Sequence, residues 1–96
     1  MAIWKLTPID LGHRNWQASS FAQEIIVRAG SKDKARKIAT NAFCKGVTSP
    51  PGEEIPTNPW SQPALVSASE IKGSNYPETG QEEILDPEEA RAYNNA

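Results

Sequence analysis

The sequence has little cysteine, little histidine and no long hydrophobic run. The single cysteine, Cys44, excludes an internal disulfide, and a small chain without a disulfide framework is typical of a reducing compartment, so we expect the cytoplasm. The longest stretch without a charged or turn-forming residue is far too short to span a bilayer. The first residues also lack a basic leader followed by an apolar segment. We therefore expect neither a membrane span nor a secretory signal.

The same scarcity limits the chemistry that the chain can perform. One histidine, His13, and one cysteine cannot supply the three or four ligands of a zinc site. A nucleophile and base pair built from Cys44 and His13 is disfavoured, because Cys44 lies near the C-terminal end of a predicted helix, where the helix dipole opposes a thiolate. No glycine-rich phosphate-binding motif is present. The sequence thus predicts a protein that is not an enzyme and that uses no cofactor and no metal.

The charges are divided between the two halves of the chain. Residues 1–50 hold eight Lys and Arg against three Asp and Glu, a net +5, whereas residues 51–96 hold two against nine, a net −7. We expect the acidic C-terminal half to lie near the basic helix and partly neutralise it. The alternative is a basic binding surface with an acidic tail that competes with its ligand.

A chain of 96 residues has room for one domain with one modest core, so we assign residues 1–96 to a single domain. Four segments have the period-two alternation or the β-branched composition of strands. In the first of them Trp4 and Leu6 point to one side, and Pro8 ends the segment. The predicted strands are residues 3–7, 24–29, 64–71 and, most weakly, 82–85.

The main helix is predicted over about residues 31–45. Ser31 is a suitable N-cap, and Asp33 in the first turn suits the positive end of the helix dipole. An apolar stripe at helical spacing contains three alanines, which implies close approach to a sheet. Its members are Ala35, Ile38, Ala39, Ala42 and Phe43. We therefore predict an α+β fold, in which a small three- to four-stranded, mainly antiparallel sheet has this helix packed across one face.

Two further segments complete the prediction. Residues 46–63 contain five prolines, which exclude a continuous helix or a central strand, so this segment is a long Pro-rich loop. Trp60 is expected to anchor its far end to the body. At the other end of the chain Asp86 and Pro87 begin a short helix that frays into an acidic C-terminal tail over residues 86–96.

The leading functional hypothesis is a protein-interaction domain. Trp16 and Trp60 lie in predicted loops, where aromatic residues can mark a recognition surface, or can close the open ends of a small core. Since no catalytic constellation is present, we expect binding of a protein partner, or self-association, through an exposed sheet edge and the loop surface around these two tryptophans.

Nucleic acid is the alternative ligand. A helix N-terminus with several basic side chains favours phosphate. The candidate phosphate contacts are Lys32, Lys34, Arg36 and Lys37. The stretch resembles the last helix of double-stranded RNA-binding domains, and Asp33 departs from that pattern because it places a negative charge where the family has a lysine. Only some two dozen residues precede it, where the family needs a helix and three strands. The matching positions are Ser31, Lys32, Ala35, Arg36 and Ala39.

Over nearly its whole length the chain resembles a group of small uncharacterised bacterial proteins. The shared elements are a Trp-x-Leu-Thr-Pro-Ile-Asp opening, an Asn-Trp-x-Ala-Ser loop, an Ile-Val-Arg-Ala strand and an Ala-Arg-x-x-Ala helix. The resemblance implies a bacterial, cytoplasmic, single-domain protein and implies no activity. In this sequence the elements are residues 4–10, 15–19, 26–29 and 35–39.

Overall fold

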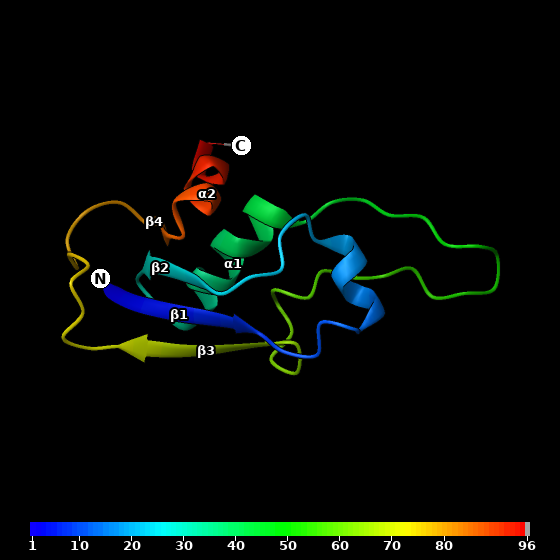
Figure 1. Ribbon diagram of the computed structural model, residues 1–96, viewed down its shortest axis with the longest axis horizontal. Coiled ribbons are helices and arrows are strands. Elements are labelled where there is room, and N and C mark those ends of the chain that lie inside the picture. The colour runs from blue at the N-terminus through cyan, green and yellow to red at the C-terminus, as the bar shows by residue number, and fades with distance from the viewer. Residues whose placement is uncertain (96) are drawn as a thin grey trace.

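A computed structural model describes residues 1–95 of the chain and the side chains of residues 1–93. Four antiparallel strands form one sheet in the order β3-β1-β2-β4, and the main helix α1 (Lys32–Phe43) lies across one face of it (Figure 1). This confirms the predicted α+β fold. The strands are β1 (Ala2–Pro8), β2 (Ile25–Ala29), β3 (Val66–Ile71) and β4 (Glu83–Asp86).

The register places the apolar residues of the strands as the alternation predicted. Leu6 lies between Ile25 of β2 and Ala68 of β3, and Trp4 lies opposite Val27. Directly opposed residues of antiparallel strands share a face, so these side chains all point towards α1. They belong to the hydrophobic core or pack against it.

Helix α1 begins as its sequence predicts. The Ser31 side chain accepts a hydrogen bond from the Lys34 N–H at 3.2 Å, and Ala35, Ala39 and Phe43 are buried. The helix ends at residue 43, two residues before the predicted end, because the following residues pair with the segment before β2. The Lys45 N–H donates to the Ala18 carbonyl oxygen at 2.8 Å.

The connection through α1 determines which strands lie at the edges. Strands β2 and β3 are both antiparallel to β1 and lie on either side of it, so they are parallel to each other. The chain leaves β2, crosses one face of the sheet as α1, and returns beyond β1 as β3. Strands β3 and β4 are therefore the two edges of the sheet.

The structure differs from the prediction between β1 and β2. The segment predicted as a plain loop contains a short 3-10 helix, η1 (Arg14–Ala18). Its N-cap is His13, whose Nδ1 accepts a hydrogen bond from the Asn15 N–H at 3.0 Å. Asparagine and serine are common in loops, but here a side-chain cap makes one turn of helix favourable.

The predicted short C-terminal helix is present, although it begins later than expected. Asp86 is the last residue of β4 rather than a helix cap, and α2 (Glu88–Arg91) and η2 (Ala92–Asn95) follow it. Ala90 is fully buried, and the ring of Tyr93 lies 5.0 Å from that of Phe43. Apolar contacts thus hold a segment whose composition is mostly polar. Residue 96, the end of the predicted tail, lies outside the described residues.

The Pro-rich segment 46–63 contains no helix and no strand, as its prolines predicted. Much of it extends from one end of the molecule as a long loop (Figure 1). The longest dimension of the chain is 47 Å, against 25 and 19 Å for the other two. Its far end returns to the body at Trp60, the predicted anchor, which is fully buried.

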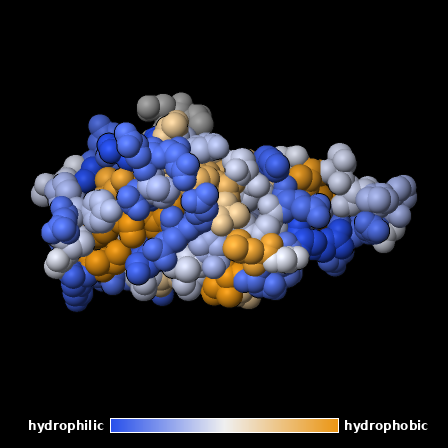
Figure 2. Space-filling model, viewed as in Figure 1, coloured by the Kyte–Doolittle hydropathy of each residue, from blue (hydrophilic) through white to orange (hydrophobic). Residues whose placement is uncertain are grey.

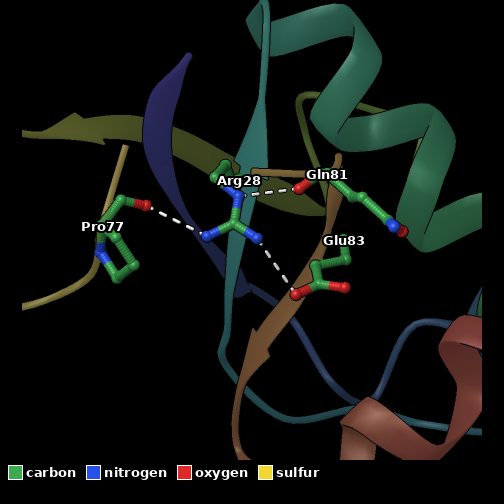
Figure 3. Close-up of polar contacts among 4 residues, drawn as sticks. All are labelled: Arg28, Pro77, Gln81 and Glu83. Atoms are coloured by element: carbon green, nitrogen blue, oxygen red, sulfur yellow. Dashed lines mark hydrogen bonds and ion pairs between the residues drawn. The ribbon is translucent and has the colours of Figure 1, made fainter. Parts of the chain in front are cut away.

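The face of the sheet opposite α1 is crossed at one end by the connection 72–82. Arg28 of β2 points to this face and is only 6% exposed. Its guanidinium group donates to the Gln81 carbonyl oxygen at 2.7 Å and the Pro77 carbonyl oxygen at 3.1 Å, and pairs with Glu83 at 3.1 Å (Figure 3). These bonds compensate for the burial of a charged group, and they fix the connection against the sheet.

Gly80 allows this arrangement. Its φ is 128°, and a Cβ there would lie 2.7 Å from Arg28 Nη2. We expect Gly80→Ala to lower the free energy of unfolding by about 1–3 kcal/mol, because the substitution combines backbone strain with a clash against a buried guanidinium group. Urea unfolding will measure the change. The control, Gly46→Ala, has open space at its Cβ and is expected to remain within about 0.5 kcal/mol of the wild type. Equal stability of the two variants would contradict this account.

Candidate functional site

Trp16 and Trp60, the predicted partner surface, are buried. Trp60 is 0% exposed and Trp16 is 7% exposed, and their rings meet edge to face with centroids 5.5 Å apart. Trp60 Nε1 donates to Ser19 Oγ at 2.8 Å, and Trp16 Nε1 donates to the Ile9 carbonyl oxygen at 3.3 Å. Both indole N–H groups are thus satisfied inside the protein, and the rings close one end of the core, which is the second of the two roles considered for them.

The surface around these tryptophans is a groove between η1 and the Pro-rich loop. Arg14 donates to the Glu54 carbonyl oxygen, and the Thr57 N–H donates to Asn15 Oδ1 at 3.1 Å. Figure 2 shows mainly hydrophilic side chains over the projecting end of the molecule. The groove therefore offers polar groups that are partly engaged in holding the loop. Its lining residues are His13, Arg14, Asn15, Glu53, Glu54, Ile55 and Thr57.

The four basic residues of α1 do not converge on one site. Lys32, Lys34 and Lys37 are exposed, whereas Arg36 is only 9% exposed. At the start of the helix Glu82 Oε2 accepts the Gly30 N–H at 2.8 Å. A Cβ at Gly30 would lie 3.5 Å from this oxygen and 3.8 Å from Lys34 Nζ. A carboxylate thus already occupies the region where a helix N-terminus attracts phosphate.

Arg36 belongs to the packing of the fold. Its Nη1 donates to the Trp60 carbonyl oxygen at 3.4 Å, which joins α1 to the segment that leads into β3. Burial lowers the pKa of Arg36 from its ordinary value, while the nearby Asp33 acts in the opposite direction. The remaining flank of the helix forms a shallow hollow, called here the α1 hollow. It is lined by Asp33, Arg36, Lys37, Thr40 and Ser61.

One hydrogen bond shows which backbone groups of β3 point towards β1 and which point away from the sheet. The Ile9 N–H donates to the Leu65 carbonyl oxygen at 2.8 Å, so residue 65 directs its backbone groups towards β1. Backbone direction alternates along an antiparallel strand. Residues 67, 69 and 71 therefore also face β1, and they are opposite Thr7, Lys5 and Ile3. The N–H and C=O groups of residues 66, 68 and 70 point away from the sheet.

Two of these three residues, Ala68 and Glu70, have an outward N–H and an outward C=O that both lack a hydrogen-bond partner within residues 1–95. The Val66 N–H is already bonded to the Gln62 carbonyl oxygen at 3.0 Å. For Ala68 and Glu70, no outward hydrogen bond is found within residues 1–95, and no strand in that range lies beyond β3. Figure 1 shows β3 along the outer border of the sheet. Together with the α1 hollow, this edge is the candidate site.

The residues considered for catalysis or metal binding are differently placed. Cys44 is exposed after the end of α1, and His13 caps η1. In the described part of the chain, no group of three or more His, Cys, Asp and Glu side chains could hold a metal ion. Across residues 1–95, no helix has the length and apolar character required to cross a membrane.

No protein family model, curated protein or solved structure matches this chain.

Sequence reasoning identified β3 as a strand but did not identify it as the edge beside the α1 hollow. The strand order depends on how α1 crosses the sheet, and no local pattern reports this. The composition of β3 gave one partial signal, since Ser67 and Ser69 alternate with small or apolar residues. Small polar residues are typical of a strand with one solvated side.

The structural role of Arg36 can be tested by stability. We expect Arg36→Ala to lower the free energy of unfolding by about 1–3 kcal/mol, because the Trp60 carbonyl oxygen loses a charged donor and the helix loses a buried aliphatic stem. Lys37→Ala, one residue away and exposed, should change it by no more than about 0.5 kcal/mol. Urea unfolding of both variants measures the two changes in the free energy of unfolding. If they are equally stable, Arg36 is a surface cation available to a ligand.

Proposed function

We propose that this protein is a small, non-enzymatic protein-binding domain that pairs an extended segment of its partner with the free edge of β3. The observation that supports this proposal is the outward direction of the N–H and C=O groups of Ala68 and Glu70. An edge of this kind is a template for another strand. The proposal assumes a cytoplasmic partner, in line with the single cysteine.

The two edges of the sheet are protected to different degrees. β4 has four residues, its register with β2 shifts at Ile26, and Pro87 follows it directly. Short length, an irregular register and proline all discourage further pairing. β3 has six residues and contains no proline, no lysine and one charged residue, Glu70. The protein thus leaves open the edge that is better suited to strand addition.

The α1 hollow adds a place for side chains. Ser61, which lines the hollow, directly precedes Gln62, whose carbonyl oxygen is bonded to the first residue of β3. A strand added to β3 would direct every second side chain to the same face as Ala68, the face covered by α1. Backbone bonds would supply affinity, and the hollow would supply selectivity.

Nucleic-acid binding through the basic helix is the second proposal, and its support is that three lysines of α1 are exposed. Titration of labelled duplex RNA and DNA at low salt tests it. A phosphate-binding surface gives an affinity that falls as the salt concentration rises. Absence of binding at low salt would contradict it. The three lysines are Lys32, Lys34 and Lys37.

The strand-addition proposal predicts a specific loss in Glu70→Pro. Proline removes the outward N–H of residue 70 and leaves the β1-facing bonds of residues 69 and 71 in place. The matched control, Glu70→Thr, removes the same charge and keeps the N–H. For peptides selected from a displayed library of random sequences, we expect the proline variant to bind about tenfold more weakly than the threonine variant, because one or more backbone hydrogen bonds are lost.

Amide chemical shifts should locate the bound peptides. Binding should change the Ala68 and Glu70 resonances most, and amide exchange at these two positions should slow. If no peptide is selected, if the peptides change resonances far from β3, or if the two variants bind equally, the proposal is wrong. Urea unfolding of both variants checks that the fold is retained.

A further inference from the structure

We infer that the strand that fits this edge is β3 of a second copy of this chain, paired antiparallel so that Ser69 faces Ser69 across a two-fold axis. The inference rests on the function proposed above and names its partner. Three observations support it: the free backbone groups of β3, the direction of the Glu70 side chain, and the charges that line the α1 hollow.

The hydrogen bonds of this register match the free groups. With Ser69 on the axis, Ala68 of each copy lies opposite Glu70 of the other. Both residues direct their backbone groups outwards, and outward-facing residues directly opposite each other exchange two hydrogen bonds. The two equivalent pairs use the N–H and C=O groups of Ala68 and Glu70 in both copies. The Val66 N–H, which is bonded to Gln62, is not required.

Neighbouring registers fit less well. An axis through Ala68 would place Glu70 of the second copy opposite Val66, where the Gln62 carbonyl oxygen already occupies the bonding position. An axis through Glu70 would place two carboxylates directly opposite each other, which is unfavourable. The register centred on Ser69 avoids both conflicts.

Charge complementarity supports the same register. Glu70 is exposed and shares the α1 face of the sheet with Ala68. Opposite Ala68, whose methyl group leaves space, Glu70 of the second copy is directed towards the α1 hollow. Among the described residues Lys37 of this hollow forms no ion pair. Arg36 is bonded to the Trp60 carbonyl oxygen, and Asp33 also lines the hollow, so Lys37 is the cation that the Glu70 carboxylate of the second copy meets. The two-fold axis repeats the arrangement, so each copy supplies one carboxylate and receives one.

On the other face of the joined sheet, the residue at the axis and its neighbour Ser67 are both serines. Ser69 faces Ser69, and Ser67 faces Ile71 of the second copy. Both serines are exposed in the single chain, so no buried group must be uncovered before the strands pair. One strand edge buries a limited area, so the dimer is weak and depends on concentration.

Disulfide trapping tests the register. In a Cys44→Ser background, Ser69→Cys places two sulfurs across a non-hydrogen-bonded pair, where the Cα atoms lie about 4.5 Å apart, within the range of a disulfide. Ser67→Cys is the matched control, because the two copies of residue 67 are separated by about 13 Å along the strands. We expect a covalent dimer to form under mild oxidation at least tenfold faster for Ser69→Cys than for Ser67→Cys. Equal rates would overturn the register.

Charge exchange tests the role of the hollow. By light scattering from about 0.01 to about 1 mM, Glu70→Lys and Lys37→Glu should each weaken self-association about fivefold, because the two-fold axis makes each substitution remove two exposed ion pairs. The double variant, with both substitutions in one chain, should recover most of the lost affinity. In its dimer the new cation at position 70 of one copy lies beside the new carboxylate at position 37 of the other. Additive losses in the double variant would overturn the pairing of Glu70 with the hollow.

The outcomes also separate this inference from the proposed function. A wild-type chain that remains monomeric over the whole concentration range, with no preferential trapping at residue 69, overturns self-pairing. If selected foreign peptides still change the Ala68 and Glu70 amide resonances, strand addition at β3 remains and only the identity of the partner is wrong. If neither occurs, both proposals are wrong.

Discussion

The arrangement of the whole chain depends on the burial of Trp60. Its indole ring packs against Phe43 at the end of α1, with centroids 5.2 Å apart, and against Trp16 of η1. Its N–H is bonded to Ser19, and its carbonyl oxygen accepts a bond from Arg36. One residue thus joins the helix, the segment before β2 and the approach to β3. Because a domain of this size has one modest core, an aromatic residue that fills its open end also determines where the last part of the chain can begin its return to the sheet.

The two oppositely charged halves meet through particular contacts. On the face opposite α1, Arg28 from the basic half pairs with Glu83 from the acidic half. At the start of α1, Glu82 accepts a bond from the Gly30 N–H beside Lys34. Glu82 and Glu83, where the connection passes into β4, therefore both bond to residues at the end of β2 or just after it. The one ion pair among the described residues thus involves a strand arginine and none of the lysines of α1, so neutralisation of the basic helix stays a prediction.

Local patterns predicted the elements and their faces, because alternation in the strands and the stripe of α1 depend only on nearby residues. The cap at Ser31 was predictable for the same reason. The burial of Arg36 was not, since it depends on the Trp60 carbonyl oxygen, 24 residues away. Loop position left two roles open for Trp16, a recognition surface or closure of the core, and its burial agrees with the second. The open edge at β3 follows from strand order, which long-range crossing determines. Nearby sequence thus predicted the scaffold, and contacts between distant segments determined the candidate site.

The difference between the two edges of the sheet also limits the size of any assembly. A molecule with one open edge can join only one neighbour, and a two-fold pair then has no edge left for a third. The register shift at Ile26 and the proline at position 87 disfavour pairing at β4. Without them each chain would have two edges able to pair, and repeated addition of chains would produce fibres. Under the proposed pairing, the irregular fourth strand disfavours growth beyond the two-fold pair.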